Sequence, residues 1–427
     1  MSRPPSITSK ALAVGLLAIL LLIPVFLVQL VISERADRRN QVVNEIASTW
    51  GRAQQLTGPV LAIPGEHRVQ RQDGTWQSQA YTSYFLPKTL RLNAEVSPEL
   101  RRRSLYETAV YAADLKIQGQ FDLDELARHL GDNPELMPQK AELLFGITDM
   151  KGVKDNIQLV LGGDKLPLTP GVSSGPVHSG VAAPLDLSGK AGALPFDLKL
   201  SLRGSSRLSF LPVGEQTQVQ VSSSWPSPSF DGAFLPAERT LSSQGFEAHW
   251  QVLHFNRNYP QFFQAGQYQL GGSDFGVSFL VTADSYQQAM RISKYAILVI
   301  ALTFMTLFFV EALLKRRVHP LQYLLVGLAL GVFYILLLAF SEHIGFGPAY
   351  LVASLATITL IGCYSLAVLG SRRLAALVAG VLTLLYGYIY VILQLEDMAL
   401  LMGAVGLFAV LALVMYLTRR LDWYALD

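Results

Sequence analysis

Six long apolar stretches constrain this chain more than any other feature of its sequence. Each is about twenty residues long, which is the length that a helix needs to cross the hydrocarbon core of a bilayer. A helix bonds its own backbone groups internally, so an apolar helix of that length is stable in lipid. The predicted spans are Ala11–Ile32, Tyr295–Leu314, Leu321–Phe340, Tyr350–Leu369, Leu374–Leu393 and Ala399–Leu417.

The composition of the chain agrees with a membrane protein. Hydrophobic residues make up 51% of the 427 residues and charged residues only 15%, whereas soluble domains carry about 25% charged residues. The net charge of +2 and the lack of a basic stripe exclude a nucleic-acid partner. The apolar run of the first span is too long for a signal peptide and no A-x-A cleavage site follows it, so we expect an uncleaved anchor.

The positions of lysine and arginine predict the orientation of the spans. Arg3 and Lys10 precede the first span, and further basic residues lie at 315–320, 370–373 and 418–424. These segments all fall on one side of the membrane if every predicted span crosses it. Basic residues in short loops stay in the cytoplasm, so both termini are predicted to be cytoplasmic.

This topology divides the chain into five parts. Residues 1–10 form a cytoplasmic N-terminus, residues 11–32 the anchor helix, and residues 33–294 an exported domain outside the cytoplasm. Residues 295–417 form a five-helix transmembrane bundle, and residues 418–427 a cytoplasmic C-terminus. The only cysteine, Cys363, lies in the fourth predicted span, so the exported domain contains no disulfide.

The exported domain is predicted to be rich in antiparallel β-structure after an initial helix over 33–50. Apolar and polar residues alternate with the period of two that is typical of half-buried strands. A short helix capped by Asp122 interrupts this pattern, and the Gly-, Ser- and Pro-rich tract 166–195 is interpreted as a surface connection or a long hairpin. The predicted strands cover residues 90–96, 106–121, 196–204, 216–225 and 246–255.

The fold class is therefore a membrane protein of the α+β type, with six transmembrane helices and a large β-rich domain inserted after the first. A Phe-Leu-Pro sequence precedes a strand both at 85–87 and at 210–212. This repeat fits either an internal duplication of the domain or independent use of a short turn signal.

A polar cluster is predicted at the outer membrane surface. The third span ends at Glu342 and His343, and the fifth ends at Glu396 and Asp397. Three interpretations are open: a joint that docks the β-domain on the bundle, ordinary interfacial residues, or a metal or acid–base site. We expect the joint, with a charge partner such as Arg257 or Arg291. No recognisable catalytic or metal-ligand spacing is present, and no cofactor is expected.

Small residues on two predicted spans indicate close helix packing. Gly327 and Gly331 form a G-x-x-x-G pattern on the third span, and Gly403 and Gly406 lie on the sixth. No span carries an ionisable residue near its midpoint, where ion and solute pathways usually place one. A solute exporter is therefore the third choice of function.

The segment 223–236 contains three aromatic residues in a Pro- and Ser-rich setting, Trp225, Phe230 and Phe234. It is too rich in proline for a central strand. Its aromatic side chains either form a partner-binding loop or cover the core, and we favour the cover.

Five segments together resemble the CreD family of bacterial inner-membrane proteins: "VHPLQYLLVGLALGVFYILLLAFSEHIGF" (318–346), "LQLEDMALL" (393–401), "MYLTRRLDWY" (415–424), "SSWPSPSFDGAFLP" (223–236) and "NRNYPQ" (256–261). The chain departs from the family pattern at Met398, where tyrosine is frequent, and at "TDMKG" (148–152), where a Ser-Asp-x-Arg-Gly run is frequent. The resemblance implies a Gram-negative, stress-responsive protein of a two-component regulon, associated with envelope integrity and colicin tolerance. It implies no known reaction and no catalytic residues.

The expected function is thus a non-enzymatic envelope-integrity and stress factor. Its expected partners are membrane lipids and a periplasmic protein or cell-wall component. The main alternative is a membrane-surface enzyme that acts on an envelope lipid or glycan. The sequence leaves the oligomeric state open.

Overall fold

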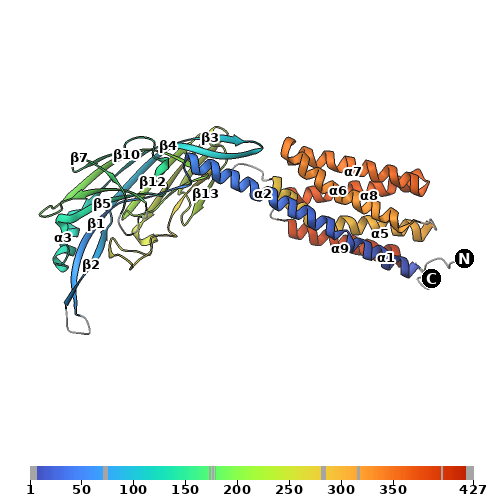
Figure 1. Cartoon of the computed structure of the whole chain (residues 1–427), viewed down its shortest axis with the longest axis horizontal. Helices are drawn as coiled ribbons and strands as arrows, with labels where there is room; N and C mark the ends of the chain where they lie inside the picture. The colour runs from blue at the N-terminus through green and yellow to red at the C-terminus, as the bar shows by residue number, and fades with distance from the viewer. Residues whose placement is uncertain are drawn as a thin grey trace. The chain divides into compact units, whose positions relative to one another are not determined.

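Two compact units make up the protein (Figure 1). The computed structural model describes residues 7–70, 76–172, 175, 177, 179–279, 285–314, 318–395 and 398–419. One unit, the helical unit, comprises Met1–Asn40 and Ala283–Asp427, and the other, the β-domain, comprises Gln41–Thr282. Helix α2 belongs to both units, because it runs without a break from Leu22 to Trp50.

The helical unit contains the apolar segments. Its elements within the described residues are α1 (Ile7–Leu20), the first part of α2, α4 (Ser285–Lys294), α5 (Ala296–Leu314), α6 (Pro320–Ile344), α7 (Phe346–Leu369), α8 (Arg372–Gln394) and α9 (Ala399–Thr418). Four helices are long and apolar enough to cross a membrane, namely Leu12–Trp50, α6, α7 and α8. The pair of α4 and α5, bent by 43°, adds a fifth candidate, whereas the apolar part of α9 described here, Leu401–Tyr416, is shorter.

Local sequence signals set the boundaries of the membrane helices. Pro320 occupies the first turn of α6. A backbone N–H has no intrahelical acceptor at this position, so proline, which lacks one, is tolerated there. The His319 ring nitrogen accepts a hydrogen bond of 3.2 Å from the Leu321 N–H and caps the same end. Gly370 ends α7 in the left-handed conformation (φ 60°), which glycine adopts without strain.

The β-domain is a sandwich of two sheets. The first sheet has the strand order β13-β17-β11-β1-β5-β9-β8, with β2 between β1 and β16. Its strands are β1 (Gln54–Gln70), β2 (Trp76–Phe85), β5 (Ala141–Ile147), β8 (Thr169–Pro170), β9 (Gly180–Leu185), β11 (Arg207–Phe210), β13 (Pro228–Gly232), β16 (Phe262–Gln264) and β17 (Phe275–Phe279).

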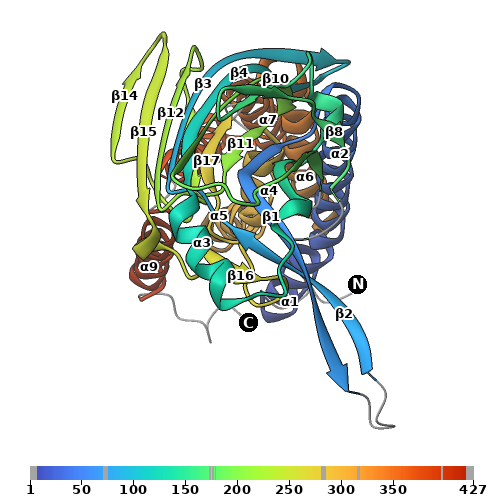
Figure 2. The same cartoon turned by 90° about the vertical axis from the view of Figure 1, so that its left-hand side faces the viewer.

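The second sheet has the order β14-β15-β12-β3-β4-β10-β6-β7. Its strands are β3 (Thr89–Arg103), β4 (Tyr106–Asp122), β6 (Gln158–Leu161), β7 (Asp164–Leu166), β10 (Ala193–Ser205), β12 (Gln216–Ser223), β14 (Glu238–Ser242) and β15 (Gly245–Leu253). In Figure 2, β3, β4 and β10 lie side by side in one layer, and β1, β11 and β17 belong to the other.

One hydrophobic core fills the space between the two sheets. The Tyr111 hydroxyl of the second sheet donates a hydrogen bond of 2.8 Å to the Arg207 carbonyl of the first. The rings of Trp250 and Phe275, also from opposite sheets, have centroids 5.7 Å apart. Alternating buried side chains on β3 and β10 supply this core, which is the pattern expected for a sheet with one solvated face.

Most of the predicted elements are confirmed. The five predicted strands correspond to β3, β4, β10, β12 and β15. The predicted short helix is α3 (Leu123–Asp132), and the Asp122 carboxylate caps it by accepting a hydrogen bond of 3.1 Å from the Glu125 N–H. Tract 166–195 is not a surface connection, because β9 pairs with β5 and is mostly buried. The alternative of a long hairpin agrees with the antiparallel pairing of β8 with β9.

The two Phe-Leu-Pro segments occupy related places in the sandwich. Each follows a strand of the first sheet, β2 or β11, and precedes a strand of the second, β3 or β12. β3 and β12 are parallel neighbours, with Leu90 opposite Thr217. β1 and β11 form a second parallel pair, so the sheets are mixed rather than purely antiparallel.

Candidate functional site

Glu342 lies in the last turn of α6, where it joins this helix to α4. The Tyr286 hydroxyl of α4 donates a hydrogen bond of 2.9 Å to the Glu342 carboxylate. Tyr286 is buried and Glu342 is half-buried. Because α4 is the first described helix after the β-domain, this bond fixes the start of the C-terminal helices on the end of α6.

The other members of the predicted polar cluster do not join this contact in the described part of the chain. His343 is exposed, and its Nδ1 atom lies 3.1 Å from the Ala339 carbonyl of its own helix. Glu396 and Asp397 lie outside the described residues. Among the residues that were searched, no three His, Cys, Asp or Glu side chains are grouped so that they could hold a metal ion.

Arg257, one of the two charge partners suggested for the polar cluster, makes its contacts inside the β-domain. Its guanidinium is buried in the β-domain, where it donates hydrogen bonds to the Tyr259 and Val213 carbonyls and to the Gln261 side chain. It also lies 4.3 Å from the centre of the Tyr259 ring. Burial lowers the pKa of Arg257 to about 10. The "NRNYPQ" segment is therefore an internal tie of the sandwich.

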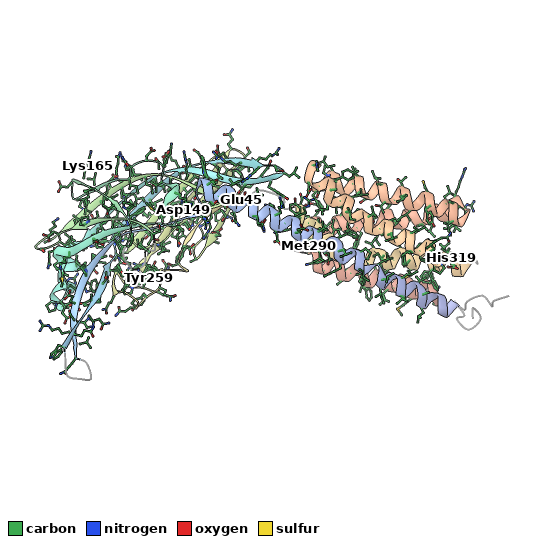
Figure 3. All side chains as sticks on the ribbon, in the orientation of Figure 1. Glu45, Asp149, Lys165, Tyr259, Met290 and His319 are labelled. Carbon is green, nitrogen blue, oxygen red and sulfur yellow. The ribbon has the colours of Figure 1, made fainter. Side chains whose placement is uncertain are left out.

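The C-terminal turn of α2 is fastened to the β-domain by a set of cationic contacts. The guanidinium carbons of Arg101 and Arg203 lie 3.6 and 4.4 Å from the centre of the Trp50 ring. The Trp50 indole N–H donates a hydrogen bond of 3.3 Å to the Tyr111 carbonyl. Figure 3 labels Glu45, whose carboxylate pairs with Arg103 at 2.6 Å. The helix thus ends as part of the sandwich.

The predicted packing glycines differ in their surroundings. A side chain at Gly327 would overlap Leu21 and touch Phe304, so this glycine permits a close approach of helices. Gly331 is buried, but a Cβ atom there would meet no described atom within 4 Å. Gly406 lies against the Tyr388 ring of α8, whereas a Cβ atom at Gly403 would meet none of the described residues within 4 Å.

A face of α7 carries buried hydroxyl groups that the sequence analysis missed. Tyr350, Ser354, Thr357 and Ser365 follow one another at helical spacing and are each at most 7% exposed. The Tyr350 hydroxyl donates a hydrogen bond of 2.6 Å to the Tyr386 carbonyl of α8. The three- and four-residue spacing of these polar residues was visible in the sequence and indicates a helix–helix contact.

The three aromatic residues of segment 223–236 pack against the core. The Trp225 ring meets Phe279 edge-on at 6.3 Å, and the Phe234 ring meets Phe275 at 5.9 Å. The Phe230 ring lies 5.7 Å from Trp250. The segment forms β13 at the edge of the first sheet, which is where a proline-containing strand is tolerated.

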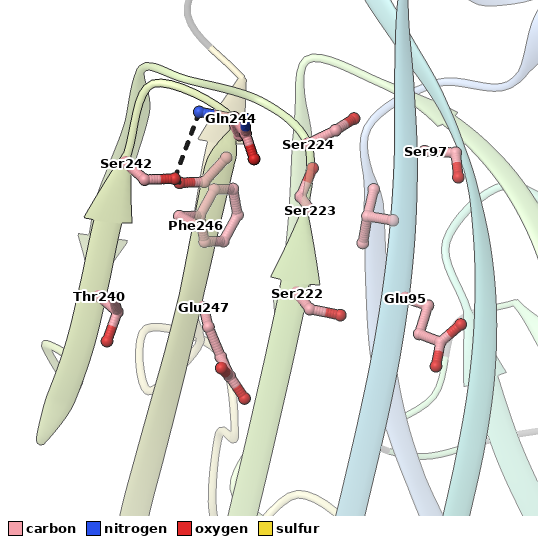
Figure 4. Close-up of a pocket in the computed structure, with 12 residues that line it drawn as sticks. Glu95, Ser97, Ser222, Ser223, Ser224, Thr240, Ser242, Gln244, Phe246 and Glu247 are labelled. Carbon is pink, nitrogen blue, oxygen red and sulfur yellow. Dashed lines mark hydrogen bonds between the residues drawn. The ribbon is translucent and has the colours of Figure 1, made fainter.

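A hollow of about 510 Å³ lies on the outer face of the second sheet (Figure 4). Hydroxyl and carboxylate groups dominate its lining. Thr240, Glu247, Ser222 and Glu95 occupy adjacent strands and face one another in strand register. The hollow is wide open to solvent, which is the geometry of a contact surface rather than of an enclosed active site.

Acidic side chains continue this row onto the next strand. Glu95 of β3 lies directly opposite Asp114 of β4, and Ser201 of β10 donates a hydrogen bond of 2.6 Å to Asp114. Like charges directly opposite each other destabilise a sheet. The row is therefore an acidic strip on the solvated face of the sandwich.

Two comparisons with known proteins match nearly the whole chain. The family model described as "Inner membrane protein CreD" matches residues 6–424. The inner membrane protein CreD of Escherichia coli (strain K12) is 37% identical over 414 residues, which cover 95% of this chain and 91% of that protein. A match over nearly the whole length confirms the predicted resemblance, and the chain belongs to the CreD family of inner membrane proteins.

Proposed function

We propose that this protein supports the integrity of the bacterial cell envelope, and its response to stress, without acting as an enzyme. In this proposal it has six spans with both termini in the cytoplasm, and residues from about 33 to 294 lie in the periplasm. The distribution of lysine and arginine supports this orientation. The β-domain is the part that contacts a periplasmic protein or a component of the cell wall.

The contacts of Glu342 and His343 support the proposal that the protein is not an enzyme. These residues were the best acid–base candidates in the sequence, and each has a structural partner. Glu342 accepts a hydrogen bond from Tyr286, and His343 lies within hydrogen-bond distance of the Ala339 carbonyl. An acid–base pair must reach one substrate together, whereas the Glu342 carboxylate is held by Tyr286 of α4 and the exposed His343 ring lies against its own helix. The Glu342 contact therefore favours a helix joint.

The fastening of α2 supports a binding role for the β-domain. Trp50, at the end of the helix that begins in the anchor, contacts Arg101 and Arg203 of the sandwich. The continuity of α2 from Leu22 to Trp50 supports anchoring of the sandwich to the membrane by this helix. Such an anchored domain suits a protein that holds a partner at the membrane surface.

The proposal is tested by complementation in a strain of the protein's own host that lacks the gene. Growth in the presence of deoxycholate is compared for the wild type, His343→Ala, Glu342→Gln and a form in which a flexible linker replaces residues 41–282. We expect His343→Ala to restore resistance fully and the form without the β-domain to fail at equal abundance in the membrane. Loss of resistance by His343→Ala at normal abundance would instead favour a membrane-surface enzyme.

A further inference from the structure

A second cavity of the β-domain lies apart from the acidic strip and the Glu342 contact. Its volume is about 510 Å³, within the range of about 300–1,000 Å³ that is typical of small-molecule sites. The start of β1, the end of β2 and the connection between β16 and β17 supply most of its lining. It is more enclosed than the hollow on the second sheet.

The cavity has an apolar, aromatic interior. Tyr84, Phe263, Leu211 and Leu270 line it and are each at most 4% exposed. The rings of Tyr84 and Phe263 have centroids 5.7 Å apart. None of the described lining residues is Asp, Glu, Lys, Arg or His. A charged ligand would lose its hydration here without gaining a counter-ion, so the cavity selects an uncharged ligand.

Neutral polar groups surround this apolar interior. The side-chain amides of Gln55 and Gln269 and the hydroxyls of Thr57 and Tyr268 form no hydrogen bond with any described residue. Tyr268 is 43% exposed, and its ring meets Phe263 edge-on at 5.8 Å. Four neutral polar groups that have no hydrogen-bond partner among the described residues therefore lie beside an aromatic surface.

We propose that this cavity binds an uncharged glycan of one or two pyranose rings that carry acetamido groups. A pyranose ring presents an apolar C–H face, which fits against aromatic side chains, and an edge of neutral hydroxyls, which fits amides and hydroxyls. An acetamido group adds a carbonyl acceptor and an N–H donor that glutamine side chains complement. The inference rests on the proposed periplasmic location and names a cell-wall type of ligand for the β-domain.

Glycines shape the exposed rim of the site. Gly266 and Gly272 have φ values of 85° and 87°, in the region that favours glycine. They flank the segment that presents Tyr268 and Gln269. This segment places one ring and one amide at the mouth of the cavity, which is the arrangement needed to hold a sugar ring by its face and its edge.

The experiment is a titration of the full-length protein in lipid nanodiscs, because maltoside detergents carry sugar rings of their own. The probe is N,N′,N″-triacetylchitotriose, and cellotriose is the matched sugar without acetamido groups. Binding is followed by saturation-transfer NMR. We expect saturable binding of the acetylated sugar and at least tenfold weaker binding of cellotriose.

Three variants separate stacking, hydrogen bonding and folding. Tyr268→Ala should weaken binding about tenfold through the lost ring contact, whereas Tyr268→Phe should stay within about threefold. Gln269→Ala should weaken binding about fivefold. Phe255→Ala, which removes an exposed aromatic ring (84% exposed) outside the cavity lining, is the control and should not change binding.

The proposal is overturned if no saturable binding is seen up to 10 mM sugar, a concentration that corresponds to a binding free energy of about −2.7 kcal/mol. It is also overturned if Phe255→Ala and Tyr268→Ala bind the sugar equally well. Binding of an uncharged peptide but no sugar also overturns it. If sugar binds, sedimentation with purified peptidoglycan sacculi and flotation with liposomes that hold a polyprenyl-linked disaccharide distinguish the two natural sources. A failed titration with intact deoxycholate resistance leaves the proposed envelope role standing and removes only the glycan.

Discussion

A hydrogen bond of 2.9 Å between Tyr286 and Glu342 joins the beginning of α4 to the end of α6. The acceptor is a carboxylate, and hydrogen bonds to charged groups stabilise proteins by about 1.5–3 kcal/mol. We predict that Tyr286→Phe lowers the free energy of unfolding by about 1–2 kcal/mol in nanodiscs. His343→Ala, at an exposed position of the same turn, should change it by less than about 0.5 kcal/mol. Equal melting temperatures for the two variants would contradict the joint.

Gly327 and Gly331 provide a matched test of helix packing in the bundle. Gly327→Ala introduces a methyl group into the space of Leu21 and Phe304, so it should destabilise the protein by about 1–3 kcal/mol. Gly331→Ala should be nearly neutral, because no described atom lies within 4 Å of the added methyl group. The melting temperatures of the two variants are compared by thermal unfolding, with light scattering as the signal. A larger effect at Gly331 would be inconsistent with the described contacts.

Arg257 is predicted to stabilise the β-domain strongly. Its replacement by alanine removes the donors that satisfy the buried Tyr259 and Val213 carbonyls. The expected loss is about 2–4 kcal/mol. Arg257→Lys should recover little of it, since an ammonium group does not reproduce the planar array of donors. Urea unfolding of the full-length protein measures both, with Arg91→Ala, at an exposed position of β3, as a control.

Asp122, at the start of α3, contributes to the stability of the fold in a way that is lost at acidic pH. The hydrogen bond from Lys88, and then that from the Glu125 N–H, lowers the pKa of the Asp122 carboxyl below its ordinary value of 3.8. Since the folded-state pKa is the lower one, the contribution is present above pH 3.8 and is lost as the pH falls through the folded-state pKa. Asp122→Asn should reduce this loss of stability at acidic pH while retaining the helix cap. Asp122→Ala should lower the free energy of unfolding by about 1 kcal/mol at neutral pH.

Glu95→Gln should make the β-domain more stable rather than less. The substitution removes one of two like charges that face each other on β3 and β4, Glu95 and Asp114. Relief of such a pair is worth about 0.2–1 kcal/mol, and less at high salt. Chemical denaturation at two salt concentrations tests this. A destabilised Glu95→Gln protein would show that the acidic strip forms a favourable structural contact.

The sequence was sufficient for the elements with strong periodicity. The alternation of apolar and polar residues located β3, β4, β10, β12 and β15, because each has one face in the core and one in solvent. β9 was missed, since its residues are buried on both sides and its Gly-, Ser- and Pro-rich neighbours resemble a loop. Strand order was also beyond the sequence, because parallel pairing of β3 with β12 depends on contacts that no local pattern encodes.

The candidate sites were less predictable than the fold. Glu342 was identified from its place at a helix end, but its partner Tyr286 lies in an amphipathic turn with no distinguishing signal. The internal role of Arg257, one of two suggested charge partners of the polar cluster, was not predicted, because its burial arises only when Tyr259 and Gln261 fold around it. The uncharged cavity brings together Gln55, Tyr84 and Gln269, which lie far apart in the chain.

The parallel pairs β1–β11 and β3–β12 impose an order on the maturation of the β-domain. In the proposed periplasmic topology, β1 and β3 each need a neighbour from beyond residue 206, and these strands are made and exported much later. Until then the N-terminal half presents unsatisfied strand edges in the compartment to which it is delivered. Pairing of this sequence separation is also slow. The interval between export of Arg103 and export of Ser223 is therefore the period of greatest exposure to proteolysis and aggregation, and slowing translocation within it should reduce the yield of folded protein more than slowing it afterwards.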